Sequence, residues 1–182
     1  MKKVEDQYKQ KGLRRHALTV LKEKGITDGI KLEAINTIPR HYFLDSAFDK
    51  IAYEDRAFPI GEGQTISQPY TVACQSQLLQ VKKSDKVLEI GTGSVYQATV
   101  LAELGAWVYT IERQKKLYDL QQKNYYFRNK YPNIKFFFGD GFEGLPTYAP
   151  FDKILITAAA PHVPPKLVAQ LKLRVLIVLH SD

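Results

Sequence analysis

The chain has 182 residues, of which 45% are hydrophobic and 25% are charged, and its formal net charge at pH 7 is +7. This composition excludes an intrinsically disordered chain, and no apolar run is long enough to span a bilayer. The positive charge permits binding to nucleic acid or to a membrane surface without requiring it, because the basic residues are spread along the chain. We therefore expect one globular domain, with no membrane or nucleic-acid partner.

Cysteine and histidine usage limits the compartment and the chemistry. Cys74 is the single cysteine, which excludes an internal disulfide and fits a reducing compartment. No apolar segment follows the N-terminal lysines, so we expect no signal peptide and a cytoplasmic protein. The four histidines lie far apart without metal-ligand spacing, so no metal site is expected.

Residues 4–50 are predicted to be mainly helical. A first helix ends at Gly25, a good helix stop, and its apolar face contains Leu13, Ala17, Val20 and Leu21. A second helix, capped by Thr27 or Asp28 and ended by Pro39, is expected to turn four apolar side chains inward. These side chains are Ile30, Ala34, Ile35 and Ile38.

Residues 53–69 form a long connection, and Pro69 then begins a helix that runs to about Val81. The connection holds two glycines, two prolines and small polar residues. A connection of this length inside a compact domain is usually functional or disordered. We therefore look there for part of a site.

From residue 86 the pattern changes to short apolar runs separated by helical stretches. Strands are predicted at residues 86–91, 107–112, 134–140, 152–157 and 174–179, and helices at 95–104, 114–130 and 164–171. Near-continuous apolar strands that alternate with helices indicate a parallel sheet covered on both faces. The prediction is a single doubly wound α/β domain over residues 1–182. It divides into a helical extension (1–55), a loop and helix (56–81) and an α/β core (82–182).

Three signals converge beyond the carboxyl ends of the first three predicted strands, where ligands of such folds bind. The first is the turn EIGTG, residues 89–93, whose glycines let the backbone approach a ligand closely. The second is Glu112, nineteen positions after Gly93, which can accept hydrogen bonds from both hydroxyls of a ribose. The third is GDG, residues 139–141, where a carboxylate could meet an adenine amino group.

The pattern favours S-adenosylmethionine over a dinucleotide. The turn reads E-x-G-x-G and does not complete G-x-G-x-x-G, the dinucleotide pattern whose helix N–H groups bind a pyrophosphate. S-adenosylmethionine has no phosphate, and its cationic sulfonium and amino groups favour carboxylates such as Glu89. A glycine turn alone is a weak signal, but Glu112 at this spacing strengthens it.

Six stretches, in this order, resemble the protein-L-isoaspartate O-methyltransferases. They are IPRHYFLDSAF, AYEDRAFPIGEGQTISQPYTVA, VLEIGTGS, VYTIER, GDG, and PFDKILITAAAP followed by VP. The resemblance extends over about residues 12–171. QTISQP is more diagnostic than the glycine turn, which all class I methyltransferases share in some form.

The resemblance implies a class I methyltransferase (Rossmann-like) sheet, S-adenosylmethionine as the cofactor, and damaged proteins that carry L-isoaspartyl residues as substrates. Methylation of the free α-carboxylate gives an ester that collapses to a succinimide, and hydrolysis of the ring returns some normal aspartate. A carboxylate is already ionised at pH 7 and needs no general base. This agrees with the lack of a convincing Ser-His-Asp or Cys-His set in the sequence.

The family's functional residues can be carried over by position. Ser67 matches the family's assigned active-site serine, and we interpret it as a hydrogen-bond donor that orients the carboxylate; otherwise it is a polar turn residue before a helix. The implied cofactor-binding residues are Gln64, Thr65, Ile66, Glu89, Gly91, Thr92, Gly93, Glu112, Asp140 and Gly141. The implied substrate cleft contains Ile60, Thr157, Ala158, Ala159, Ala160 and Pro161, although small residues also serve ordinary packing at strand ends.

The sequence departs from the family in two places. Val95 stands where the family normally has glycine. If that position needs a positive φ, a β-branched residue costs about 1–3 kcal/mol, whereas in an ordinary helical turn the cost is mainly crowding. After LVAQLK the family usually has a Gly-Gly turn, a strand and a final strand pair, and here LKLRVLIVLHSD follows. An uncovered apolar edge strand is then expected, which invites pairing with other chains; otherwise we expect a monomer.

Two alternatives stay open at this point. Val95 and the altered C-terminus favour a remnant of the family with impaired or no activity, whereas Glu89, Glu112, Asp140 and QTISQP favour an active enzyme. A methyltransferase for another substrate, such as RNA, is disfavoured because residues 157–161 read TAAAP and no N-P-P-Y-type segment is present.

Overall fold

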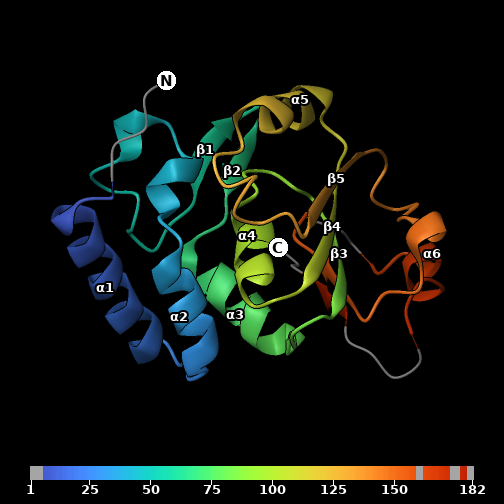
Figure 1. Ribbon diagram of the computed structural model, residues 1–182, viewed down its shortest axis with the longest axis horizontal. Helices are drawn as coiled ribbons and strands as arrows, with labels where there is room; N and C mark the ends of the chain where they lie inside the picture. Colours follow the sequence, from blue (N-terminus) through green and yellow to red (C-terminus); the bar gives the residue numbers. More distant parts are fainter. Residues whose placement is uncertain (1–5, 159–161, 173–176, 180–182) are drawn as a thin grey trace.

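The computed structural model describes residues 6–158, 162–172 and 177–179 (Figure 1). Its main sheet has five parallel strands in the order β5-β4-β3-β6-β7. They are β3 (Lys86–Ile90), β4 (Trp107–Glu112), β5 (Ile134–Phe138), β6 (Lys153–Ile156) and β7 (Ile177–Leu179). The predicted doubly wound α/β architecture is therefore confirmed. The strand order reverses beside β3, between β4 and β6, which is where such folds bind ligands.

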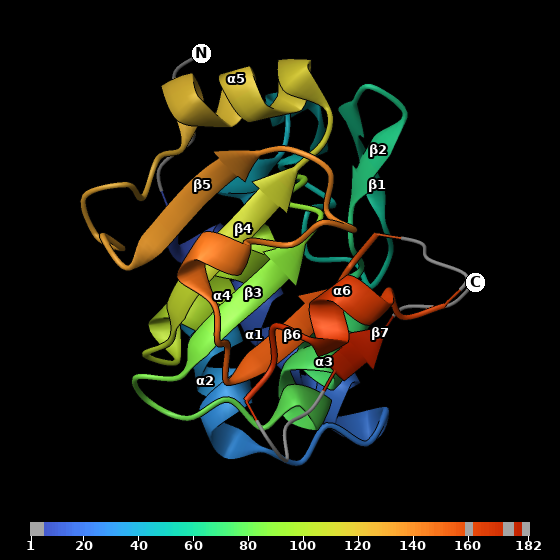
Figure 2. The same ribbon diagram turned by 90° about the vertical axis from the view of Figure 1, so that its right-hand side faces the viewer.

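Helices cover both faces of this sheet (Figure 2). Helices α3 (Pro69–Leu79) and α4 (Tyr96–Glu103) lie on one face, and the short α6 (Pro165–Val168) lies on the other. Alternate strand residues serve the two faces, since Val87 belongs to the apolar cluster that contains Leu101 of α4, while Leu88 belongs to the cluster that contains Leu167 of α6. Helix α5 (Lys115–Asn124) follows β4 and packs against β4 and β5.

The N-terminal extension is a helical layer packed against α3 and α4. It contains α1 (Tyr8–Glu23), α2 (Gly29–Thr37) and the short 3-10 helices η1 (Arg40–Phe43) and η2 (Ser46–Phe48). Asp28 caps α2 by accepting hydrogen bonds from the N–H groups of Ile30 and Lys31. The prediction that Ile30 points inward is wrong, because its side chain is 71% exposed. Ile30 lies at the edge of the buried face, about 100° around the helix from Lys31.

Several element boundaries differ from the predicted ones. The connection at 53–69 contains an antiparallel hairpin of β1 (Phe58–Gly61) and β2 (Gln64–Ile66), which the sequence analysis missed. Helix α5 ends at Asn124 and not near residue 130, because the next residue, Tyr125, is buried with its hydroxyl 2.9 Å from Thr99 Oγ1. Helix α3 ends at Leu79, α6 covers only four residues, and a further 3-10 helix, η3 (Pro146–Tyr148), precedes β6.

The C-terminal edge of the sheet agrees in part with the prediction. Of the strand expected at 174–179, residues 174–176 lie outside the described residues, and β7 pairs with β6 in parallel. Among the described strands, β7 is the last in the sheet order. Within the same ranges, no helix has the length and apolar character needed to cross a membrane.

Candidate functional site

A cavity of about 120 Å³ lies beyond the carboxyl ends of β3 and β4, beside the point where the strand order reverses. It brings together most of the residues that the sequence singled out. Those lining it are Gln64, Thr65, Ile66, Ser67, Gly91, Thr92, Gly93, Glu112, Gly141, Thr157 and Ala158. Ile60, Glu89 and Asp140 do not line it, and Ala159, Ala160 and Pro161 lie outside the described residues.

The turn after β3 lines the cavity and packs closely against the end of β6. Gly91 has φ +100°, and a Cβ at that position would stand 2.9 Å from Thr157 Oγ1, so only glycine fits. Thr157 donates its hydroxyl to the carbonyl oxygens of Ile90 (2.9 Å) and Gly91 (2.8 Å). The ends of β3 and β6 are thereby held together, and the backbone of the turn forms one wall of the cavity.

Glu112 is held at the end of β4 with its carboxylate facing the turn. Its Oε2 accepts a hydrogen bond from the N–H of Gly93 (2.9 Å), and its Oε1 accepts one from the N–H of Gln114 (2.8 Å). The side chain lines the cavity and is largely buried. Each carboxylate oxygen keeps a further acceptor site, so the group can receive two hydroxyl donors of a ligand.

Glu89 lies beneath the turn and not in the cavity. Its Oε2 accepts a hydrogen bond from Thr110 Oγ1 (2.6 Å), which is itself 2.7 Å from Thr92 Oγ1. Its Oε1 is buried and has no hydrogen-bond partner among the described residues. Burial raises the pKa of Glu89 to about 8; the hydrogen bond from Thr110 opposes this and the charge of Glu112 adds to it. Glu89 therefore supports Thr92 through Thr110, and its carboxyl group is largely protonated at neutral pH.

Val95 occupies a backbone conformation that favours glycine. Its φ is +71° and its ψ is 0°, in the left-handed region, and its side chain is fully buried. This settles the question that the sequence left open, because the position does need a positive φ. A β-branched residue there is strained.

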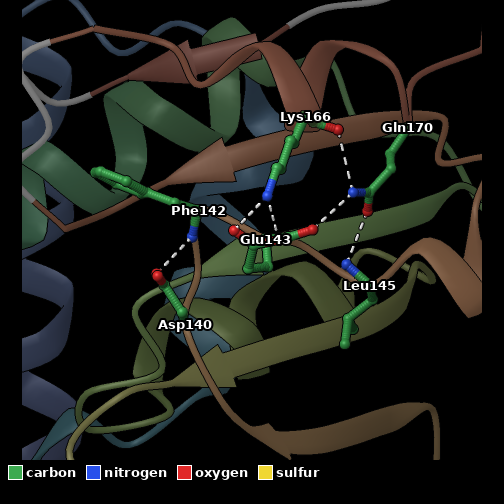
Figure 3. Close-up of polar contacts among 6 residues, drawn as sticks. All are labelled: Asp140, Phe142, Glu143, Leu145, Lys166 and Gln170. Atoms are coloured by element: carbon green, nitrogen blue, oxygen red, sulfur yellow. Dashed lines mark hydrogen bonds and ion pairs between the residues drawn. The ribbon is translucent and has the colours of Figure 1, made fainter.

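The loop after β5 is tied to the segment that follows α6 (Figure 3). Gln170 accepts a hydrogen bond from the N–H of Leu145 (2.7 Å) and donates to the carbonyl oxygens of Glu143 (2.8 Å) and Lys166 (3.1 Å). Gly141, which lines the cavity, packs so closely that an added Cβ would stand 2.3 Å from Ile90 Cγ2.

Asp140 lies in the same loop but is exposed. Its Oδ1 accepts a hydrogen bond from the N–H of Phe142 (2.9 Å), a local turn contact that leaves its other oxygen available. The loop therefore presents Gly141 to the cavity and Asp140 beside it.

The hairpin brings Ser67 to the opposite wall of the cavity. Ser67 follows β2 directly, is half-buried, and its carbonyl oxygen accepts a hydrogen bond from Arg40 Nη2 (2.9 Å). Ile60, on β1, is close to the turn, since a Cβ added at Gly93 would stand 3.7 Å from Ile60 Cδ1. The segments that are far apart in sequence therefore meet around one space.

The cavity also contains residues that the sequence analysis missed, namely Val72, Ile90, Ser94, Tyr96, Gln97, Ile111, Arg113 and Gln114. Four of these eight residues, Ile90, Ser94, Ile111 and Arg113, are adjacent in sequence to a predicted residue, so the carboxyl ends of the strands were a usable signal. Val72, Tyr96 and Gln97 lie on helices α3 and α4, and their side chains reach the cavity only through tertiary packing. In the described part of the chain no group of three or more His, Cys, Asp or Glu residues is arranged to hold a metal ion.

Comparison of the sequence with known families gives one clear match. Residues 13–179 match the sequence profile of the family described as protein-L-isoaspartate(D-aspartate) O-methyltransferase. A protein-L-isoaspartate O-methyltransferase of Flavobacterium johnsoniae is 55% identical over 186 residues, covering 98% of this chain and 84% of the relative. One of Flavobacterium psychrophilum is 56% identical over 173 residues, covering 93% of this chain and 79% of the relative.

Solved structures are similar over most of the chain. A protein-L-isoaspartate O-methyltransferase superposes with a TM-score of 0.81 at 30% identity, covering 91% of this chain and 54% of that one. A Plasmodium falciparum protein in complex with S-adenosyl-L-homocysteine superposes with a TM-score of 0.77 at 23% identity, covering 93% of this chain and 84% of that one. The second likeness concerns the fold alone.

Proposed function

The chain belongs to the protein-L-isoaspartate(D-aspartate) O-methyltransferase family, and we propose that it methylates the α-carboxylate of L-isoaspartyl residues in damaged proteins. The fold is that of the class I S-adenosylmethionine-dependent methyltransferases. The observation that carries the proposal is the meeting of Ser67, Glu112 and the turn at Gly91 around one cavity. Ser67 belongs to the segment QTISQP, and Glu112 and Gly91 belong to the predicted cofactor signals.

The residues present fit S-adenosylmethionine. The glycine turn at Gly91 lines the cavity, and the Glu112 carboxylate offers two acceptor oxygens to the ribose hydroxyls. Gly141, which lines the cavity, and the exposed Asp140 beside it would meet the adenine, with Asp140 as acceptor for its amino group. When bound, the cofactor supplies a methyl group on a positively charged sulfur. Gln64, Thr65 and Ile66 close the cavity from the hairpin.

In this scheme the protein contributes alignment and exclusion of water. The substrate carboxylate is already ionised at neutral pH, so no side chain has to remove a proton. Ser67 donates a hydrogen bond to one carboxylate oxygen and leaves the other oxygen directed at the methyl carbon. Ile60, Thr157, Ala158, Ala159, Ala160 and Pro161 form the cleft for the substrate chain. Holding the reacting atoms in line supplies the main part of the rate enhancement.

The test uses two synthetic peptides that differ only in one residue, L-isoaspartate in one and L-aspartate in the other. Each is incubated with the purified chain and S-adenosylmethionine labelled in its methyl group, and base-labile methyl esters are counted. We expect ester only with the isoaspartyl peptide. Equal labelling of both peptides, or none, contradicts the proposed substrate.

Calorimetric titration with S-adenosylmethionine separates the two ways in which the peptide test can fail. Cofactor binding without methyl transfer points to another substrate. A folded chain that does not bind the cofactor is a remnant of the family, a reading that the strained Val95 favours. Salt-dependent retention of RNA would revive an RNA substrate.

We further propose that the chain works as a cytoplasmic monomer, one domain over residues 1–182, on protein substrates and not on nucleic acid or a membrane. The single cysteine, Cys74, supports a reducing compartment. Pairing of the edge strand β7 between copies is the alternative. Light scattering distinguishes the two, because a mass near twice 20.8 kDa indicates pairing.

A further inference from the structure

We propose that Arg40 is a positioning residue, which sets the place of Ser67 by binding its backbone. This inference rests on the proposed function, since it concerns the residue that orients the substrate carboxylate. Arg40 belongs to η1 in the helical extension and lies outside the cofactor-binding core. It does not line the cavity, so any effect on the reaction must pass through its neighbours.

The guanidinium group of Arg40 binds three backbone carbonyls from separate segments. Its Nη2 donates to the carbonyl oxygens of Ser67 (2.9 Å) and Arg56 (3.1 Å), and its Nη1 donates to that of Ala52. These carbonyls lie 12, 16 and 27 residues away along the chain. One planar group therefore fixes the entry to the hairpin and its exit relative to each other.

Within the described part of the chain, no carboxylate contacts the charge on Arg40. Among the described residues it forms no ion pair, and the nearby Asp55 is bound instead to Lys24 Nζ and to the N–H of Tyr70. The side chain is 1% exposed, and burial lowers the pKa of Arg40 to about 10, so it stays charged at neutral pH. Burying a charge is costly unless the charge is well hydrogen-bonded. The hydrogen bonds to the three carbonyl oxygens therefore offset the cost of burying the guanidinium group.

Arg40 also contacts the wall that carries the cofactor turn. Its guanidinium carbon lies 5.9 Å from the ring centre of Tyr96 and 5.4 Å from that of Phe58. Tyr96 directly follows Val95, begins α4 and lines the cavity, while Phe58 begins β1. The same group thus touches the hairpin and the helix on opposite sides of the space where the reaction is proposed.

Arg14 provides a matched control within the same extension. It is buried to 7% exposure, forms an ion pair with Asp6 (3.0 Å) and donates to Tyr53 Oη (3.2 Å). Among the described residues, Arg14 forms no hydrogen bond or ion pair with the hairpin. Arg14→Lys therefore removes a buried guanidinium from the same layer without releasing Ser67.

The kinetic test is a double-mutant cycle with isoaspartyl peptide as substrate at saturating cofactor. We expect Arg40→Lys to lower kcat on the order of 10- to 100-fold with a cofactor Kd within about twofold, because a small misplacement of a reacting group has effects of that size. In a Ser67→Ala background the same substitution should change kcat less than about threefold. Equal factors in both backgrounds, or an equal loss in Arg14→Lys, would overturn the proposal.

A second readout does not need activity and separates failure of this inference from failure of the proposed function. Hydrogen exchange is followed in a peptic peptide that covers residues 64–68. Arg40→Lys should accelerate exchange there by about tenfold or more and leave β4 unchanged, while Arg14→Lys leaves residues 64–68 unchanged. If Arg40→Lys does not fold, Arg40→Gln replaces it, since glutamine donates without a buried charge. Unchanged exchange at 64–68 in the folded variant refutes the role of Arg40, whatever the wild-type chain methylates.

Discussion

Substitution of Val95 tests directly whether the turn after β3 is strained. The side chain is fully buried among apolar residues that include Ala98 and Leu101, and its backbone has φ +71°. Alanine removes two methyl groups, about 1.6 kcal/mol of burial, and keeps a Cβ in the left-handed conformation. Glycine removes about 2.4 kcal/mol of burial and also releases about 1–3 kcal/mol of strain. Val95→Gly should therefore have a higher free energy of unfolding than Val95→Ala, by about 1 kcal/mol.

Val100 supplies the control, because it is equally buried but lies inside α4. There glycine has no strain to release and should be less stable than alanine by about 1 kcal/mol or more. Urea unfolding of the four variants gives the free energies of unfolding. If the Val95 pair follows the same order as the Val100 pair, the strain argument is refuted. If Val95 also crowds the ligand, Val95→Gly should tighten S-adenosylmethionine binding in a calorimetric titration, and equal affinity would show that it does not.

Three further substitutions test single side chains of the site. Ser67→Ala should lower kcat about 10- to 100-fold with cofactor affinity nearly unchanged, and an unchanged rate removes Ser67 from the mechanism. The folded pKa of Glu89 is raised to about 8 from 4.5, so the unfolded chain loses its proton first and stability falls as pH rises between these values. Between pH 5 and 8, the free energy of unfolding of Glu89→Gln should rise relative to that of the wild type by up to about 1.4 kcal/mol per pH unit, as measured by urea unfolding. A difference between the two proteins that does not change with pH contradicts this. Gln170→Ala should weaken cofactor binding several-fold, because it frees the loop at 140–145. Lys166→Ala removes only an exposed ion pair and should leave cofactor binding unchanged. An equal loss of affinity in both variants would contradict the role of Gln170.

The sequence was most informative where a local pattern determines the structure. The apolar runs at 86–91 and 107–112 became parallel neighbours, because strands buried on both faces must be apolar almost throughout. Glu112 reached the cavity because the carboxyl ends of parallel strands meet at one edge of the sheet. A cap was expected at Thr27 or Asp28, and Asp28 supplies it, because its side chain acts on N–H groups only two and three residues away.

Where contacts are distant in sequence, the pattern could not locate the residue. Glu89 was expected beside the cofactor, but the alternation of β3 points it under the turn, onto the face shared with Val87. The hairpin at 58–66 was hidden because one proline and two glycines interrupt its alternation. The role of Arg40 could not be predicted from the sequence, because its partners are backbone carbonyls 12 to 27 residues away. Every residue type has a backbone carbonyl, so the residue types at those positions do not reveal the contacts.

The surroundings of Val95 explain how the turn can keep its shape with a valine in it. The carbonyl oxygen of Gly93 accepts a hydrogen bond from Gln121 Nε2 (3.0 Å), and that of Val95 accepts two, from the N–H (2.9 Å) and the hydroxyl (2.7 Å) of Thr99. The N–H of Val95 donates to the carbonyl of Thr92 (2.9 Å). A strained residue persists where its neighbours fix it from several sides, and these contacts do so. The strain therefore lowers the free energy of unfolding and leaves the conformation of the turn intact. For this reason we expect Val95→Gly to change the stability of the protein more than it changes the shape of the cofactor site.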